Sequence, residues 1–155
     1  DYLRVEMTAE QGPLGTRNYR LTLEAVPMDA GTTFIHMSYA YSYGTAARLA
    51  MQAYLATVGR DKVGFSVTGT NSLGRPIYID GVRGVLERNT MRYYLAIDAY
   101  LGALGEPPAR RQEKRLKDWF DATERYPVQL HELERAEYMS LKLVAFGSKA
   151  RTTTQ

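Results

Sequence analysis

The segment from Thr33 to Tyr43 alternates large and small side chains, and this alternation limits what the chain can fold into more than any other feature. One side of the segment carries Ile35, Met37, Tyr39, Tyr41 and Tyr43, and the other carries Phe34, His36, Ser38, Ala40 and Ser42. A period of two is typical of a β-strand, so the large side chains are predicted to share one face of a sheet.

Two earlier segments, residues 3–8 and 19–25, alternate in the same way, and the short turns Gln11–Gly15 and Asp29–Gly31 connect the three segments. Consecutive strands joined by short turns predict an antiparallel meander, because parallel neighbours need a long crossover connection. A sheet with one heavy apolar face needs a second layer to cover that face.

Helical patterns follow the strands. Residues 46–58, with Thr45 as the predicted N-cap, are rich in alanine and polar only along a narrow stripe, which makes them the predicted cover of the sheet. Residues 63–81 predict a loop or a short hairpin. Residues 82–104 have the strongest helical pattern, and their predicted core side consists of Leu86, Tyr93, Ile97, Tyr100, Leu101 and Leu104.

The last helical region spans residues 108–146, and Pro127 is expected to kink or break it. The whole pattern predicts an α+β protein, with an antiparallel sheet packed on long apolar helices and a helical C-terminal extension. We expect a sheet-and-helix portion in residues 1–105, a charged helical extension in residues 106–146 and a flexible tail in residues 147–155.

Composition bounds the function classes. The 155 residues are 45% hydrophobic and 24% charged, which predicts one folded core. The net charge of +3 comes from 20 basic and 17 acidic residues, an excess too small to indicate nucleic-acid binding. The absence of cysteine excludes disulfides and thiolate sites, and no apolar run is long enough for a membrane-spanning helix.

No catalytic motif stands out, so the tyrosines of the third strand are the first candidates for a site. Aromatic side chains on the buried face of a strand usually belong to the core. However, the hydroxyls of Tyr39, Tyr41 and Tyr43 would each need a partner there, and a cavity with water or a ligand would supply one.

The segment Glu87–Arg92 places several polar side chains within an otherwise apolar helix, and it has two interpretations. In the first, Glu87 pairs with Arg83, while Arg88 and Arg92 reach solvent or nearby carboxylates. In the second, one arginine, with Arg88 as the candidate, points into the interior and binds the anionic or polar end of a ligand.

The two histidines predict neither a metal site nor acid-base chemistry. His36 has no acidic residue two positions away in its strand, and His131 lacks the second histidine of a zinc-binding helix. No cofactor is therefore expected. The cations Arg110, Arg111, Lys114 and Arg115 oppose the macrodipole of their helix, which suggests acidic contacts within the protein or, alternatively, a surface for anionic membrane headgroups.

The order of strands, the segment Thr33–Gly44 and the alanine-rich helix after it together resemble the C-terminal half of a START-like, helix-grip (SRPBCC-type) domain. The stretch Gly81–Tyr94, with Trp119–Phe120 and Glu124–Pro127 after it, is similar to a group of bacterial proteins of uncharacterised function that carry such a domain with extra C-terminal helices. The resemblance implies a curved antiparallel sheet wrapped around a long helix, with an apolar cavity between them.

The resemblance also implies that Met37, Tyr39, Tyr41 and Tyr43 line that cavity. Helix-grip domains have more strands than this chain shows, and the chain starts at Asp1 within a strand pattern, so we expect that the natural protein has strands before Asp1. The sequence does not determine the cellular compartment, and an exported or periplasmic bacterial protein is the favoured expectation.

Three functions are compatible with this pattern. The favoured hypothesis is non-catalytic binding of a hydrophobic small molecule or lipid between sheet and helix. A cyclase- or hydrolase-like enzyme would instead need Tyr41, His36 and Arg88 to converge in one pocket. A protein-protein interaction module would expose an apolar stripe along Leu116, Trp119, Phe120 and Leu130.

Overall fold

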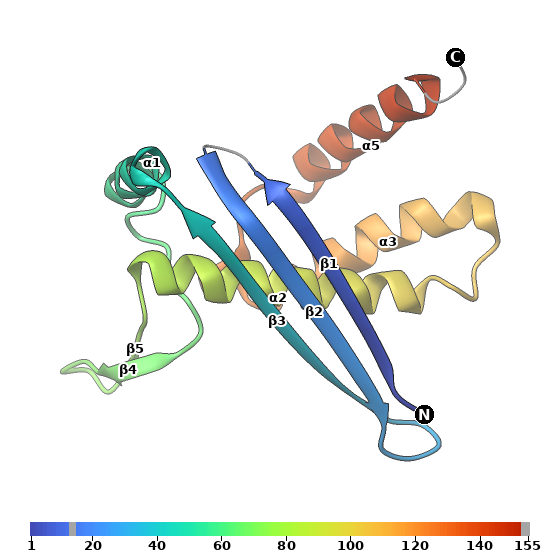
Figure 1. The fold of residues 1–155 in the computed structure, drawn as a ribbon, viewed down its shortest axis with the longest axis horizontal. Coiled ribbons are helices and arrows are strands. Elements are labelled where there is room, and N and C mark those ends of the chain that lie inside the picture. Colours follow the sequence, from blue (N-terminus) through green and yellow to red (C-terminus); the bar gives the residue numbers. More distant parts are fainter. Residues whose placement is uncertain (13–14, 153–155) are drawn as a thin grey trace.

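A computed structural model describes residues 1–12 and 15–152 of the chain. Within this part the fold is α+β, with a three-stranded antiparallel sheet, a two-stranded hairpin and five helices (Figure 1). The predicted α+β class is therefore confirmed. None of the described helices combines the length and the apolar composition needed to cross a membrane.

The main sheet consists of β1 (Leu3–Gln11), β2 (Thr16–Pro27) and β3 (Thr33–Tyr43), in the order β1-β2-β3. Both pairs are antiparallel, as the meander predicted. The register sets Val5 opposite Leu23 and Leu23 opposite Met37, so the large apolar side chains of all three strands share one face. The predicted turn Gln11–Gly15 lies partly outside the described residues.

A β-bulge interrupts the pairing of β2 with β3. Arg17 lies opposite Ser42 and Arg20 lies opposite Ala40, which leaves Asn18 and Tyr19 to face one residue of β3. Asn18 has a φ of 55°, a left-handed conformation that asparagine tolerates better than most residues.

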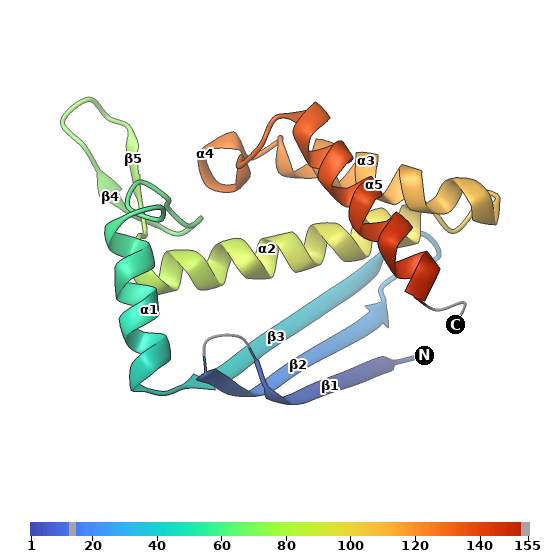
Figure 2. The ribbon, with the colours of Figure 1, turned by 90° about the horizontal axis from the view of Figure 1, so that it is seen from above.

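Helix α1 (Thr45–Ala56) does not cover the sheet, and the prediction that it does is wrong. Its N-cap is Gly44 rather than Thr45, and Ala47 is its one fully buried residue. Because Gly44 alone separates the helix from β3, the chain has no room to turn back. The helix therefore stands at the end of the sheet (Figure 2).

The layer above the sheet is α2 (Gly81–Gly102), which lies over β3 in the view of Figure 2. Before it, β4 (Val67–Thr70) and β5 (Pro76–Tyr78) form the short hairpin that was one of the two predicted alternatives. The segment between α1 and α2, which contains this hairpin, is long enough for the chain to reverse direction and place α2 over the sheet.

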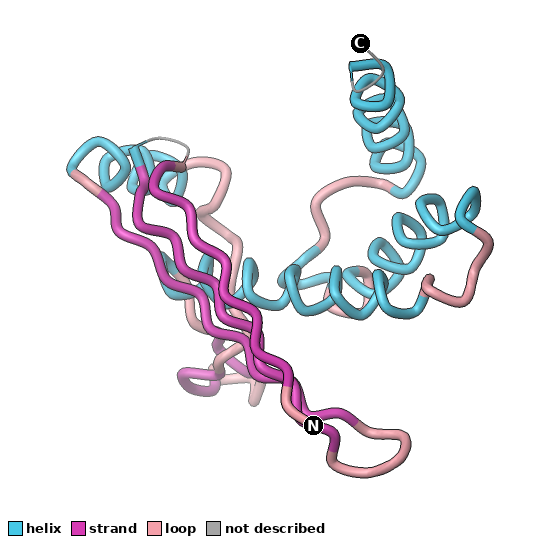
Figure 3. The backbone as a smooth tube through the Cα atoms, turned by 45° about the vertical axis from the view of Figure 1, so that its right-hand side comes forward, coloured by secondary structure: helices cyan, strands magenta, loops and turns pink. Residues whose placement is uncertain are grey.

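Three further helices follow: α3 (Pro108–Thr123), α4 (Pro127–Leu130) and α5 (Arg135–Thr152). Pro127 starts a new short helix, so the predicted break is confirmed. Helix α5 includes residues 147–152, which were expected to form a flexible tail, and residues 153–155 lie outside the described residues. Figure 3 shows α5 extending away from the sheet.

The hydrophobic core lies between the helices rather than under the sheet. One cluster joins α2, α3 and α4 through Leu95, Ala122 and Leu130, and a second joins α3 and α5 through Leu116, Phe120 and Tyr138. The predicted core side of this helix is partly wrong, because Tyr93, Tyr100, Leu101 and Leu104 are exposed. The buried residues of α2 are instead Gly84, Arg88, Leu95 and Ala99.

Candidate functional site

A groove of about 510 Å³ runs between β3 and α2. The segment just before β4 closes one side of it. Its lining side chains are mainly apolar and come from three parts of the chain: Ile35 and Met37 from β3, Phe65 and Ser66 from the segment before β4, and Leu86, Glu87, Thr90, Met91 and Tyr94 from α2.

The α2 side of the groove follows from helical spacing. Glu87, Thr90, Met91 and Tyr94 are three or four residues apart, which places them on one face of the helix. The sequence analysis did not select these residues. Their spacing would have identified the face, but nothing in the sequence showed that it would lie opposite Met37.

Glu87 is the charged residue of this lining, and it is held by several donors. Its Oε2 accepts bonds of 2.8 Å from the backbone N–H groups of Phe65 and Ser66, and its Oε1 accepts a 2.7 Å bond from the Ser66 hydroxyl. Arg83 Nε donates to Oε1 at 3.1 Å, as the first interpretation of this segment predicted.

These bonds decide the protonation state of Glu87. Burial opposes the charged form, but the bonds from Ser66, Phe65 and Arg83 outweigh it and lower the pKa of the carboxyl group to about 2. Glu87 is therefore ionised at neutral pH, and it fixes the segment before β4 against the helix.

Two glycines permit this close contact between the segment and α2. A Cβ atom on Gly64 would lie 2.7 Å from Glu87 Oε2 and 3.0 Å from the Cα atom of Gly84. A Cβ atom on Gly84 would lie 3.0 Å from the backbone oxygen of Ile79. Any larger residue would therefore push the two backbones apart.

Of the predicted ligand-binding residues, Met37 lines the groove. Tyr39, Tyr41 and Tyr43 lie beside it on the same face and pack against other rings. The ring of Tyr41 stacks on Tyr19 at 5.3 Å, and the ring of Tyr39 meets Tyr93 of α2 edge-on at 5.6 Å. Desolvation, with the neighbouring phenols, raises the pKa of Tyr39 and of Tyr41, so both stay neutral.

Arg88 points inward, as the second interpretation stated, but it does not line the groove. Only 1% of its surface is exposed, and its Nη1 donates to the backbone oxygen of Val63 at 3.2 Å. Its Nη2 lies 3.5 Å from the Tyr54 hydroxyl. The described hydrogen bonds of Arg88 thus go to protein groups, and the structure does not bring it together with Met37.

Arg92 reaches a carboxylate, as the first interpretation predicted. Its Nη2 donates to Glu132 Oε1 at 2.7 Å, and Lys62 Nζ donates to the same oxygen at 3.0 Å. Burial opposes ionisation of Glu132, but these two cations and the charge of Arg88 lower the pKa of its carboxyl group overall. Glu132 therefore joins α2 to the segments before β4 and before α5.

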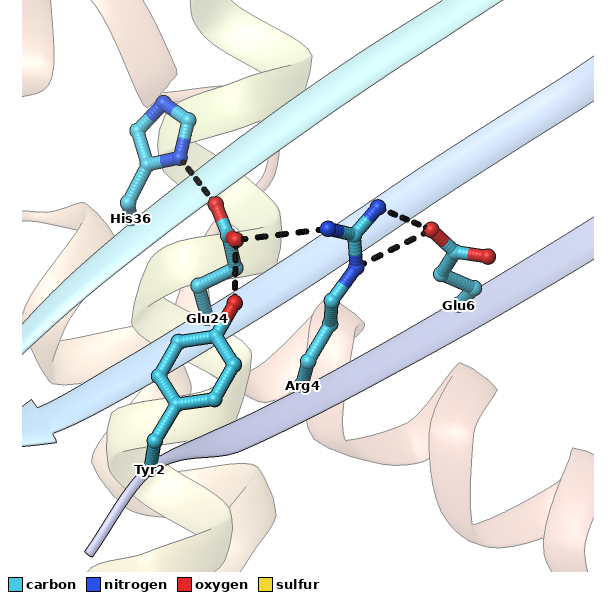
Figure 4. Close-up of polar contacts among 5 residues, drawn as sticks. All are labelled: Tyr2, Arg4, Glu6, Glu24 and His36. Carbon is cyan, nitrogen blue, oxygen red and sulfur yellow. Dashed lines mark hydrogen bonds and ion pairs between the residues drawn. The ribbon is translucent and has the colours of Figure 1, made fainter.

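His36 lies on the polar face of the sheet, with a partner that the sequence analysis missed. Glu24 of β2 lies opposite His36 in the register, and its Oε2 is 3.0 Å from His36 Nδ1 (Figure 4). Counting residues along both strands from the turn between β2 and β3 would have placed Glu24 opposite His36. Tyr2 donates its hydroxyl to Glu24 at 2.5 Å.

The enzymatic alternative required three side chains to converge, and the structure separates them. Tyr41 and His36 lie on opposite faces of the same strand, and Arg88 is bonded to the segment before β4. Among the described residues, no group of three or more His, Asp or Glu side chains is placed to hold a metal ion.

Most residues of the two predicted contact surfaces have contacts within the chain. Leu116, Phe120 and Leu130 are buried, so the stripe expected for an interaction module is not exposed. In the basic group, Arg111 Nε donates to the backbone oxygen of Glu106 at 2.7 Å, Lys114 Nζ pairs with Asp118 at 2.7 Å, and Arg115 lies over the Tyr100 ring at 3.9 Å. Arg110 is exposed.

Fold and groove together define an α+β protein with an open apolar groove between an antiparallel sheet and a long helix. Comparisons of the chain with protein-family models, with curated proteins and with solved structures found no match.

Proposed function

We propose that the groove between β3 and α2 binds a neutral hydrophobic small molecule or lipid and does not transform it. The proposal extends to the fold: residues 1–105 are the sheet-and-helix part of a START-like domain, with α2 as the helix that the sheet grips. The observation that carries the proposal is the groove itself, with its volume of about 510 Å³ and its largely apolar lining.

The size and lining suit a small ligand. Pockets for small molecules typically have volumes of roughly 300 to 1,000 Å³, apolar walls and a few polar groups that orient the ligand. Here Met37, Phe65 and Met91 supply apolar walls, and methionine side chains adapt to irregular shapes. The polar residues of the lining are Ser66, Glu87 and Thr90; the Ser66 hydroxyl donates to Glu87, which leaves Thr90 as the proposed partner for a polar atom of the ligand.

The charge of the lining argues for a neutral ligand. Glu87 is ionised, and Arg88, the expected partner of an anionic group, is not among the lining residues. An anionic headgroup placed beside Glu87 would be repelled in a partly desolvated site. We therefore expect alcohols, esters or sterol-like molecules to bind better than fatty-acid anions.

Fluorescence titration with Nile red, a neutral apolar dye, tests this proposal. The dye should bind, and Met37→Trp, which fills the groove, should weaken its binding at least about 10-fold. The matched control is Met28→Trp, on an exposed turn of the same sheet, which should leave the dye affinity unchanged.

A fluorescent fatty-acid anion should bind more weakly than Nile red, and Glu87→Gln should narrow that difference. Absence of dye binding, or equal binding by the Met37→Trp and Met28→Trp variants, would refute a ligand site in the groove. Preference for the anion would refute the argument from Glu87.

A further inference from the structure

Strand β1 is a free edge of the main sheet. Its one partner among the described residues is β2, and all nine of its residues are exposed (Figure 1). A long edge strand presents unpaired backbone N–H and C=O groups, and natural proteins normally protect such an edge with a bulge, a proline, a short strand or a covering segment. Charged side chains are a further protection, and β1 carries Arg4, Glu6 and Glu10, but within the described residues it has none of the other devices.

The two faces of β1 differ in character. Leu3, Val5 and Met7 point to the apolar face of the sheet and remain 54%, 37% and 52% exposed. Arg4 and Glu6 point to the polar face. An occupant of this edge must therefore match both an apolar row and a charged row.

We propose that β1 pairs antiparallel with β1 of a second copy of this chain, about a twofold axis at Val5. In this register Leu3 lies opposite the partner's Met7, and Val5 meets the partner's Val5. On the other face Arg4 lies opposite the partner's Glu6, and Glu6 lies opposite the partner's Arg4. Directly opposite side chains are the pairs that stabilise a sheet.

The charges select among the possible registers. A twofold axis at Glu6 would set two carboxylates against each other, and an axis at Arg4 would set two guanidinium groups against each other. An axis at Met7 would pair Arg4 with Glu10 and leave Glu6 opposite Thr8. The axis at Val5 is the one that pairs both inner charges of the strand with opposite charges.

The contacts of Arg4 within one chain are compatible with this arrangement. Arg4 donates its Nε to Glu6 at 3.0 Å and lies 3.8 Å from Glu24, so two carboxylates share one guanidinium group (Figure 4). A second copy paired at Val5 would bring the partner's Arg4 next to Glu6. Each Arg4 would then keep its contact with Glu24 of its own chain and exchange its own Glu6 for the partner's Glu6.

Sedimentation velocity of the purified protein over a wide concentration range tests the proposal, with no ligand present. The wild-type chain should form dimers, and Arg4→Glu and Glu6→Arg should each weaken self-association about 10-fold or more. Circular dichroism should show both variants folded, since both positions are exposed.

An equimolar mixture of these two variants gives the most discriminating test of the register. In a mixed dimer with the Val5 register, both charge pairs are opposite again, so the mixture should dimerise about as well as wild type. Glu10→Lys is the matched control, because in the Val5 register Glu10 lies opposite none of residues 1–9 of the partner, so the substitution should not affect the dimer. Under the Met7 register, the same substitution would weaken it.

A wild-type chain that stays monomeric at every concentration would overturn the proposal. A mixture that does not dimerise, or a dimer weakened by Glu10→Lys, would overturn the register. None of these results bears on dye binding in the groove, so this inference and the proposed function fail separately.

Discussion

The two sides of α2 differ in how completely their side chains are buried. On the side of α3 and α4, Leu95 is 2% exposed and Leu130 is 3% exposed, and Trp119 Nε1 donates to the backbone oxygen of Arg92 at 3.2 Å. On the side of the sheet, Ile35 and Met37 border an open groove, and the apolar row of β1 is uncovered. Both sides are apolar, but the clusters of buried side chains lie on the first side, and among the described residues no residue of β1, β2 or β3 is fully buried.

This difference separates stability from recognition. Buried side chains in a packed core contribute to the free energy of unfolding, whereas exposed apolar side chains contribute little to it and are available for a ligand or another chain. We therefore expect substitutions on the α3 side to change stability and substitutions on the sheet side to change binding.

The largest effect should come from Leu95→Ala, which leaves a cavity in the helical core and should lower the free energy of unfolding by about 3 kcal/mol. Leu3→Ala makes the same change on the sheet and should lower it by less than about 0.5 kcal/mol. Urea denaturation measured by circular dichroism checks both, at protein concentrations too low for self-association. Equal losses at the two positions would contradict the comparison.

Glu87 lies on the groove side and holds the segment before β4 against α2, and its contribution to stability should depend on pH. Its folded pKa of about 2 lies below the value of 4.5 expected in the unfolded chain, so its stabilisation is present above pH 4.5 and is lost as the pH falls towards 2. Glu87→Gln should therefore cost about 2 kcal/mol at pH 7 and progressively less over that range.

Denaturation curves of the wild type and Glu87→Gln at several pH values measure this difference. Glu113→Gln removes an exposed carboxylate paired with Lys117, and it should change the free energy of unfolding much less. A stability difference that stays constant from pH 7 to pH 2 would show that the ionised form of Glu87 is not what holds the segment before β4.

A smaller effect is expected from Glu132→Gln, which removes the carboxylate shared by Lys62 and Arg92. Because 48% of the Glu132 side chain is exposed, solvent screens these pairs, and the loss should be at most about 1 kcal/mol. Thermal unfolding at low and high salt measures it, and a wild-type advantage that persists in high salt would argue against an electrostatic origin.

The sequence analysis was accurate where the signal is local. The alternation of Thr33–Tyr43 and the short turns predicted the meander, and Pro127 predicted the break after α3. These features depend on neighbouring residues and on backbone preferences, which a single sequence displays directly.

The sequence analysis was wrong or incomplete where packing between distant segments determines the position of an element or a side chain. Residues 45–56 have the composition of a buried helix, but their attachment directly to β3 leaves them at the end of the sheet. Arg88 was chosen for its charge among apolar neighbours, and its burial against Val63 could not be read from helical spacing. The lining residues Phe65 and Met91 carry no signal of their own and become a site only through their position opposite β3.

The contact between Gly64 and Gly84 gives the groove a fixed wall. Since neither residue has a side chain, the segment before β4 rests backbone against backbone on α2, and no rotamer change at that contact can widen or narrow the opening. Selectivity for the proposed ligand would then come from lining side chains that can rotate, among them Met37 and Met91, so substitutions at these two positions should change which molecules fit.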